Sequence, residues 1–196
     1  MSRAFLERWL EEVIATPGLT GIEDLDIARR SLLDDALRAA PLVERVPGPV
    51  IDVGSGGGTP GIPLASVLPE RVFTLLEAER RKCDFLERVS SELANVHVVW
   101  GRAEEQETDA YGAALAKALA KPPVAAELCL PLVRPGGIAV VWVGQSADVG
   151  PVAKVAEMLA ATLEADHDGL LVLRKLGPTP SGFPRRSGMA KKRPLA

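Results

Sequence analysis

The glycine-rich stretch PVIDVGSGGGTPGIPLA (residues 49–65) constrains the fold of this chain more than any other feature. A short apolar run, residues 50–53, is followed by five glycines within eight positions, and then by an apolar segment that two prolines interrupt. Glycines between a buried strand and a helix let the backbone approach a bound molecule closely. The stretch therefore predicts a strand, a binding loop and a helix at the start of an α/β domain.

The rest of the chain supports one α/β domain. From residue 50 onward, short apolar runs alternate with helical stretches, which predicts a doubly wound, mostly parallel sheet covered on both faces. Asp168-Gly169 predicts a hairpin at the carboxyl edge. The expected strands are residues 50–53, 72–76, 96–99, 113–116, 138–143 and 170–173, and the expected helices are residues 62–68, 80–93, 123–132 and 152–163.

The first forty residues show two helical stripes of apolar side chains. One runs from Phe5 to Ile14 with Ser2 as its expected N-cap, and the other runs from Asp24 to Pro41. We expect a helical appendage on the sheet. The expected organisation is one domain of residues 1–177, made of the appendage (1–40) and an α/β core (49–177), followed by a basic, proline-rich tail (178–196).

Composition excludes several classes of protein. The length of 196 residues suits one buried core, and 47% hydrophobic with 25% charged residues is typical of a soluble globular protein. The longest apolar run, residues 138–143, is too short to cross a bilayer, and the amino terminus is no secretory signal. Cys83 and Cys129 have no metal or redox spacing, which predicts reduced thiols, no metal site and a cytoplasmic location.

Basic residues gather near the carboxyl terminus. Residues 174–196 hold seven of the 23 basic residues and none of the 26 acidic ones. This asymmetry indicates contact with a polyanion, most commonly a nucleic acid, and we expect an extended arm along phosphates. Phe183 and the prolines allow a second interpretation, in which the arm packs on the domain. A merely solvated tail is a third.

Two alignments of the glycine loop predict different ligands. GGGTPG fits the dinucleotide pattern through Gly56, Gly58 and Gly61, and would suit a nicotinamide-dependent oxidoreductase. DVGSGGG instead places Asp52 before Gly54, Gly56 and Gly58. An acid at this strand tip repels a pyrophosphate but attracts the ammonium and sulfonium of S-adenosylmethionine. We therefore expect S-adenosylmethionine, with Asp52 near its cationic end and the glycines around its adenosine.

The next two strands supply further candidates. Glu77 follows Gly54 by 23 residues and ends an apolar run, where an acid can accept hydrogen bonds from ribose hydroxyls. Both cofactors contain such a ribose, so Glu77 does not discriminate between them. Ala103 and Glu104 follow the third expected strand, where a loop would border an adenine ring.

The chain resembles the glucose-inhibited division protein B family, bacterial methyltransferases that act on N7 of a guanine in 16S ribosomal RNA. The resemblance covers about four fifths of the chain. It rests on IDVGSGGGTPGIPLA, FTLLEAERRKCDFLERV, VVWGRAEE, ELCLPLVRPGG and RKLGPTPSGFPRRSGMAKKRPL, and more loosely on LTGIEDLDIARRSLLDDAL. It implies a Rossmann-like methyltransferase fold, S-adenosylmethionine as cofactor, and small-subunit ribosomal RNA or the 30S particle as partner. The cofactor contacts that it implies are Gly54, Thr59, Glu77, Ala78, Ala103 and Glu104.

Three positions depart from the family pattern. Members usually have arginine at Lys117, lysine at Val143 and histidine at Ser31. Lys117 keeps the charge but loses the bidentate fork, and we assign it as a catalytic and cofactor-binding residue near the entering guanine. The other two changes leave a non-catalytic RNA-binding or ribosome-associated module as an alternative.

Methylation at guanine N7 fits a chain without an obvious catalytic dyad. N7 carries a lone pair and no proton, so alignment with the methyl group suffices. KPPV (residues 121–124) lacks the acid or amide and the aromatic of amine methyltransferases, and Cys129 lies in an apolar run where a nucleophile is not expected. We expect a monomer. The sequence does not specify the target nucleotide or the assembly state of the RNA.

Overall fold

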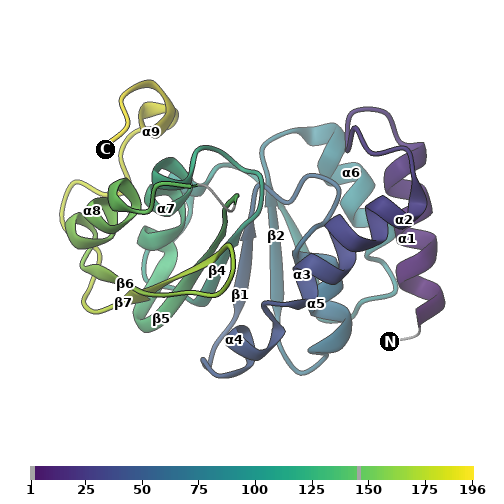
Figure 1. Cartoon of the computed structure of the whole chain (residues 1–196), viewed down its shortest axis with the longest axis horizontal. Helices are drawn as coiled ribbons and strands as arrows, with labels where there is room; N and C mark the ends of the chain where they lie inside the picture. The colour runs from purple at the N-terminus through teal and green to yellow at the C-terminus, as the bar shows by residue number, and fades with distance from the viewer. Residues whose placement is uncertain (1–2, 145–146) are drawn as a thin grey trace.

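A seven-stranded sheet forms the centre of the molecule in the computed structural model, which describes residues 3–144 and 147–196 (Figure 1). The strands lie side by side in the order β3-β2-β1-β4-β5-β7-β6. Their bounds are β1 (Val50–Val53), β2 (Phe73–Glu77), β3 (Val96–Trp100), β4 (Tyr111–Ala116), β5 (Val133–Trp142), β6 (Ala161–Asp166) and β7 (Leu170–Lys175).

The pairing of the strands confirms the predicted sheet. Strands β3, β2, β1, β4 and β5 run parallel, while β7 pairs antiparallel with β5 and β6. All four residues of β1 are buried, which explains an apolar run without polar alternation. The predicted hairpin joins β6 to β7, because Asp168 and Gly169 both adopt the positive φ that a two-residue turn requires (52° and 85°).

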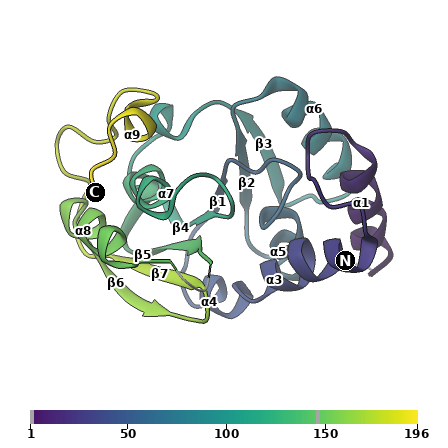
Figure 2. The ribbon, with the colours of Figure 1, turned by 45° about the horizontal axis from the view of Figure 1, so that its top comes forward.

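Helices cover both faces of the sheet (Figures 1 and 2). Adjacent residues of β1 point to opposite faces: Val50 packs in the layer of α1, α5 and α6, and Ile51 packs in the layer of α7 and α8. The helices are α1 (Arg3–Ala15), α2 (Leu25–Ala28), α3 (Asp35–Leu37), α4 (Ala40–Glu44), α5 (Gly61–Val67), α6 (Arg80–Val89), α7 (Pro122–Cys129), α8 (Gly150–Met158) and α9 (Met189–Lys192).

The amino-terminal helices differ from the prediction in their boundaries. The second helical stretch begins next to Asp24 as expected, and Asp24 caps it, since its Oδ1 accepts from the Ile27 amide (2.8 Å). That stretch continues through a π-helical segment, Arg29–Asp34, and ends with α3 at Leu37 rather than at Pro41. Pro41 instead lies in the first turn of α4, where its missing N–H costs nothing. The expected cap Ser2 lies outside the described residues.

Several other boundaries also differ. Strand β5 begins at Val133, five residues before the expected start, because the Arg-Pro-Gly-Gly stretch continues the strand. Helix α8 ends at Met158 instead of residue 163, since β6 starts at Ala161. Helix α6 ends at Val89 instead of residue 93. Residues 161–163 pair with β7, and this pairing outweighs the helical pattern that runs through them.

The basic tail does not extend away from the domain. The chain after β7 folds back over α7, and α9 lies beside that helix (Figure 2). Arg185 pairs with the buried carboxylate of Glu127 through two contacts of 2.6 and 2.7 Å, and Phe183 packs against the core. The expectation of an extended arm is therefore wrong, and the second interpretation, in which the arm packs on the domain, describes the structure.

Both cysteines are buried and unpaired in the structure. Cys129 is a core residue as predicted, and burial raises the pKa of its thiol. Cys83 is fully buried, and its Sγ lies 3.4 Å from the carbonyl of Glu77. Within residues 3–144 and 147–196, no helix is both long and apolar enough to span a membrane, and no three metal-ligating side chains cluster.

Candidate functional site

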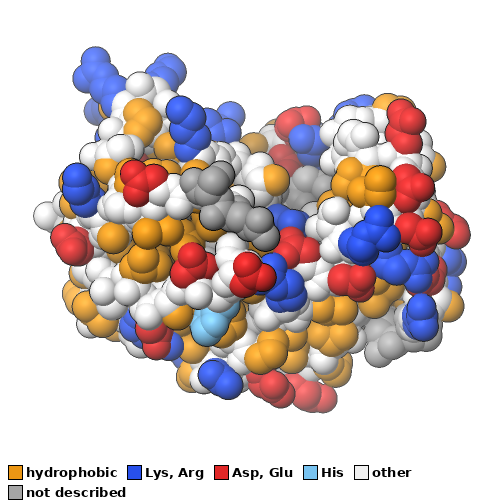
Figure 3. All heavy atoms as spheres, in the orientation of Figure 1, with side chains coloured by type: hydrophobic (Ala, Val, Ile, Leu, Met, Phe, Trp, Pro, Cys, Tyr) orange, Lys and Arg blue, Asp and Glu red, His pale blue; other side chains and the backbone are white. Residues whose placement is uncertain are grey.

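A pocket of about 690 Å³ opens at the carboxyl ends of the parallel strands, between the two shoulders of the molecule in Figure 3. Three groups of residues line it. The loops after β1, β2, β3 and β4 form its base and sides. The N-terminal wall consists of Leu19, Thr20, Ile22, Ser31 and Leu32, and the C-terminal wall consists of Gly188, Ala190 and Lys191.

The glycine loop is shaped for close approach to a ligand. The amides of Gly54 and Ser55 both donate to the Leu76 carbonyl (2.8 and 3.1 Å), which ties the loop to β2. Gly56 has a φ of 54°, and a Cβ there would point into open space, with one atom, the Gly54 carbonyl oxygen, as near as 3.9 Å. A side chain at Gly56 would therefore occupy the pocket itself. Gly54 and Gly56, which were predicted to contact the cofactor, both line the pocket.

Glu77 lies at the tip of β2 and faces this loop. Its Oε1 accepts from the amides of Ala78 and Glu79 (2.8 and 2.9 Å), and its Oε2 accepts from the amide of Gly56 (2.9 Å). A carboxylate oxygen accepts about two hydrogen bonds, so Oε2 has one acceptor position left for a hydroxyl. Glu77 thus holds the loop in place and retains one acceptor for the predicted ribose.

Asp52 lies beneath the loop and does not line the pocket. The carboxylate is 1% exposed, its Oδ2 accepts from the Gly61 amide (3.0 Å), and its Oδ1 has no partner. Burial, with a smaller contribution from Glu77, raises the pKa of Asp52 to about 7. The expectation that Asp52 contacts the cationic end of the cofactor therefore does not fit its position. The residue caps the start of α5 instead.

Gly58 also lies outside the pocket lining. A Cβ at Gly58 would come within 2.4 Å of Ile62 and 3.2 Å of the Trp9 indole nitrogen. Gly58 is needed for packing against α1 and α5, because there is no room for a Cβ atom between these helices and the loop. Thr59 does line the pocket, but its hydroxyl already donates to the Leu32 carbonyl (2.7 Å).

The two residues expected beside an adenine, Ala103 and Glu104, both line the pocket and lie in a short 3-10 turn after β3. Ala78, expected on the ribose side, directly follows β2 and also lines the pocket. The Oε1 of Glu104 accepts from the amide of Gly188 (2.8 Å). The predicted adenine loop is therefore joined directly to the C-terminal wall.

Sequence reasoning missed both walls as parts of the site. Gly188 and Lys191 lie in a segment expected to contact only RNA, and Leu19 and Ser31 lie in what was expected to be an appendage. The signal for the C-terminal wall was Phe183, the one aromatic residue of the basic tail. For the N-terminal wall, the apolar residues that follow α1 gave no sign that they face a cavity.

Lys117 directly follows β4 and lies at the edge of the pocket. Its Nζ lies 2.5 Å from Oδ2 of Asp35, and both side chains are largely buried. The prediction placed Lys117 near the cofactor and the entering base, and the structure puts it in the pocket lining, paired with a carboxylate from α3. Val143 lies outside this pocket, whereas Ser31 lines it.

The site residues fit S-adenosylmethionine better than a dinucleotide. A dinucleotide needs the free amides of a helix amino terminus for its pyrophosphate. Here Asp52 occupies the Gly61 amide, the Gly58 carbonyl accepts from the Ile62 amide, and Pro63 has no N–H. The start of α5 offers little to a phosphate, while Glu77 and the open space at Gly56 remain suited to an adenosine.

A family model and a curated relative both match this chain and carry the same description. Residues 4–167 match the family model described as rRNA small subunit methyltransferase G. The ribosomal RNA small subunit methyltransferase G of Rubrobacter xylanophilus is 40% identical over 84% of this chain and 69% of its own length.

Solved structures share the fold at low sequence identity. A protein from Corynebacterium glutamicum has a TM-score of 0.61 at 16% identity, over 89% of this chain and 91% of its own. The crystal structure of M. jannaschii TYW2 in complex with AdoMet has a TM-score of 0.54 at 16% identity, over 71% of each chain. These likenesses concern the fold alone.

Proposed function

Since this chain belongs to the rRNA small subunit methyltransferase G family, we propose that it transfers a methyl group from S-adenosylmethionine to N7 of a guanine in 16S ribosomal RNA. The observation that carries the proposal is the family match itself. It spans residues 4–167 and so includes the glycine loop, Glu77 and Lys117. The pocket at the carboxyl ends of the strands is where a doubly wound sheet binds its ligand.

The chain's own residues would hold the cofactor by hydrogen bonding and shape. Glu77 would accept from a ribose hydroxyl through its Oε2, Gly54 and Gly56 would lie against the adenosine, and Ala103 would border the adenine. When bound, S-adenosylmethionine would supply a methyl group on a positively charged sulfur.

The lining residues support a reaction without proton transfer. Guanine N7 offers a lone pair and carries no proton, so catalysis needs orientation of the base rather than a general base. Among the described residues that line the pocket there is no histidine and no cysteine. Neither a histidine base nor a cysteine nucleophile is therefore in place, which agrees with N7 as the acceptor.

The rim of the pocket suits an RNA partner. No ion pair within residues 3–144 and 147–196 involves Arg186, Lys191, Lys192 or Arg193, and Figure 3 shows basic side chains on the knob above the pocket. Such cations bind phosphates without reading sequence, so they would position the RNA while the pocket selects the base. A substrate within the ribosome places the protein in the cytoplasm.

The direct test uses small-subunit particles and purified small-subunit RNA from cells that lack this modification. The protein is incubated with each in the presence of methyl-labelled S-adenosylmethionine, and the labelled base is mapped. We expect label at N7 of one guanine, on at least one of the two substrates. Label on neither substrate, with S-adenosylhomocysteine binding intact, would favour the non-catalytic RNA-binding module instead.

Glu77→Ala tests the assignment of Glu77 to the cofactor site, and Glu157→Gln is its matched control. Loss of a charged hydrogen bond costs about 1.5–3 kcal/mol, so Glu77→Ala should weaken S-adenosylhomocysteine binding roughly 10- to 100-fold. Glu157 lies exposed on α8, outside the pocket lining, and its replacement should change nothing. Unchanged affinity in Glu77→Ala would remove Glu77 from the site.

A further inference from the structure

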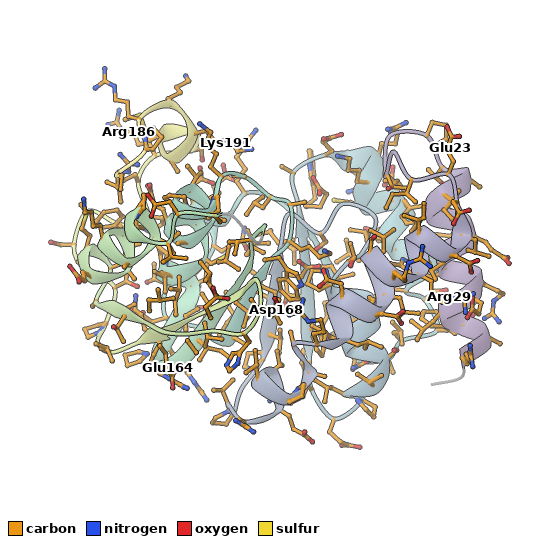
Figure 4. All side chains as sticks on the ribbon, in the orientation of Figure 1. Glu23, Arg29, Glu164, Asp168, Arg186 and Lys191 are labelled. Atoms are coloured by element: carbon orange, nitrogen blue, oxygen red, sulfur yellow. The ribbon has the colours of Figure 1, made fainter. Side chains whose placement is uncertain are left out.

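A second hollow of about 260 Å³ adjoins the main pocket. Lys117 and Ala118 line both spaces, so the two meet at the end of β4. The second hollow is lined by Asp35, Arg38, Lys117, Ala118, Trp142, Val143 and Gly169. In Figure 4 the β6–β7 turn, marked by Asp168, reaches this region near the centre of the view.

Asp35 is held in one orientation at the edge of this hollow. Its Oδ2 contacts the Lys117 ammonium (2.5 Å), and its Oδ1 accepts from Arg38 (2.9 Å). Arg38 is in turn fixed by the carbonyls of His167 and Asp168 (2.8 and 2.6 Å). The Trp142 indole nitrogen donates to the backbone carbonyl of Asp35 (3.3 Å). The hollow therefore presents a fixed carboxylate directly beside an ammonium.

This pair is complementary to guanine. On its Watson–Crick side guanine carries the O6 acceptor next to the N1–H and N2–H donors, and N7 lies on the other side of O6. An ammonium matches O6, and a neighbouring carboxylate matches the two donors. Adenine has an amino group in place of O6, and that donor would face the Lys117 ammonium. The arrangement thus favours guanine over adenine.

Resting on the function proposed above, we propose that the second hollow is the guanine subsite, in which Lys117 donates to O6 and Asp35 accepts from N1–H and N2–H. O6 is the exocyclic oxygen on the edge of the base between N7 and N1. Lys117 lines both spaces, so a base bound to it through O6 turns N7 toward the main pocket. Enzymes that modify a base commonly read its Watson–Crick edge in this way.

The same contacts would stabilise the transition state. Attack by N7 forms the N7–carbon bond and breaks the carbon–sulfur bond, whose electron pair stays on sulfur. The guanine ring becomes positively charged, and its N1–H and N2–H become stronger donors. Hydrogen bonds to Asp35 therefore strengthen as the reaction proceeds, which lowers the barrier. Pairing of Lys117 with Asp35 offsets the repulsion between the ammonium and the charged ring.

The test compares Asp35→Asn with wild type on three bases. Small-subunit RNA carries guanine, inosine or adenine at the mapped position, and single-turnover methyl transfer is measured on the particle or the RNA, whichever is methylated. Inosine lacks the N2 amino group, so wild type should be about tenfold slower on inosine than on guanine and inactive on adenine. Asp35→Asn should be 10- to 100-fold slower on guanine and should lose the preference for guanine over inosine. Its S-adenosylhomocysteine affinity should stay within twofold of wild type.

Asp26→Asn is the matched control, since Asp26 is exposed on α2 and lines neither hollow. It should behave as wild type. Lys117→Arg keeps a donor for O6 and should retain the preference for guanine. If Asp35→Asn is slow but still prefers guanine over inosine as strongly as wild type does, Asp35 acts on structure alone and the subsite is wrong. Unchanged rates would overturn it as well.

A binding measurement separates this proposal from the function it rests on. Guanosine, inosine and adenosine monophosphates are titrated into the protein saturated with S-adenosylhomocysteine and followed by NMR. Wild type should bind the guanine nucleotide at least fivefold more tightly than the other two, and Asp35→Asn should not. Failure of methyl transfer with this preference intact would reject the proposed activity and keep the subsite. Equal binding of all three nucleotides would reject the subsite.

Discussion

The N-terminal and C-terminal walls enclose the same pocket but are attached to the domain in different ways. The N-terminal wall follows a helix whose Phe5, Trp9, Leu10 and Val13 are nearly inaccessible to solvent. The C-terminal wall depends mainly on polar contacts: Arg185 with Glu127, and Gly188 with Glu104. Apolar burial makes the first wall part of the core, whereas the second wall is held by a few directional bonds.

Because of this difference, we expect the N-terminal wall to affect the stability of the domain and the C-terminal wall to affect access of the ligand to the pocket. Removal of the N-terminal wall would expose the apolar face of the sheet and of α5 and α6, so the domain should not survive it. The C-terminal segment contributes few apolar side chains to the core, namely Ala190 and the partly buried Phe183 and Leu195, so its removal would expose little apolar surface. We therefore expect changes in the first wall to unfold the protein and changes in the second to open the pocket.

The largest expected effect is that of Trp9→Ala. Trp9 is 2% exposed, and its indole nitrogen donates to the Gly57 carbonyl in the glycine loop (2.8 Å). The cavity left by the indole should lower the free energy of unfolding by about 3–5 kcal/mol in urea denaturation. Trp9→Phe keeps most of the volume and should lose about 1 kcal/mol. A loss below 1 kcal/mol in Trp9→Ala would contradict the claim that the helix before the N-terminal wall belongs to the core.

Asp52→Asn tests the floor between the walls. Because the pKa of folded Asp52 is about 7 and that of the unfolded residue is near its ordinary 3.8, the unfolded chain alone is deprotonated between these values. Wild-type stability should therefore fall as pH rises from 5 to 7, by about 2–3 kcal/mol from this residue, and level off above pH 7. Asparagine does not titrate, so the free energy of unfolding of Asp52→Asn, measured in urea, should lack this fall with pH. Parallel pH profiles for the two proteins would show that Asp52 is ionised in the fold.

Glu127→Gln should release the C-terminal wall without unfolding the domain. The change removes the charge that Arg185 contacts twice, and we expect a loss of about 1.5 kcal/mol. Trypsin should then cut after Arg185, Arg186 or Lys191 faster than in wild type. The exposed Glu157→Gln serves again as the control. Equal cleavage rates in all three proteins would mean that the ion pair does not hold the segment.

The smallest expected effect is on cofactor affinity. Deletion of residues 184–196 removes the C-terminal wall, and S-adenosylhomocysteine affinity measured by calorimetry should fall about five- to tenfold, near 1 kcal/mol. The free energy of unfolding should change little compared with Trp9→Ala. The same deletion removes Arg186, Lys191, Lys192 and Arg193, so the salt dependence of RNA binding should flatten by about three units of logarithmic slope. Full cofactor affinity in the truncated protein would leave this wall without a part in the pocket.

The architecture could be read from the sequence because local and global signals agree in the core. Buried parallel strands need continuous apolar runs, and the Asp-Gly pair specifies its hairpin, so both were predicted correctly. The positions of Glu77 and Ala103 followed from the rule that strand ends form the site, whereas Lys117 was assigned from the family resemblance. The burial of Asp52 could not be predicted in this way. Whether a side chain at a strand end points into the pocket or beneath the loop depends on the register of the whole strand.

The missed parts of the site share one physical cause. Asp35 is 82 residues from Lys117 in sequence, and Gly188 is 84 residues from Glu104. No periodicity or spacing rule relates residues so far apart. The basic residues of the tail also have two different roles. Arg185 forms an ion pair with Glu127, while its neighbour Arg186 remains exposed. Composition counts both as equal charges.

The enclosure of one pocket by segments far apart in the chain has a consequence for biosynthesis. Ribosomes add residues from the amino terminus onward, and domains begin to fold as they emerge. The N-terminal wall and the glycine loop are synthesised early, but Lys191 is added more than 170 residues after Leu19. A nascent chain can therefore build most of its core before the pocket closes. An enzyme that modifies ribosomes would therefore complete this pocket only after Lys191 has left the ribosome that makes it.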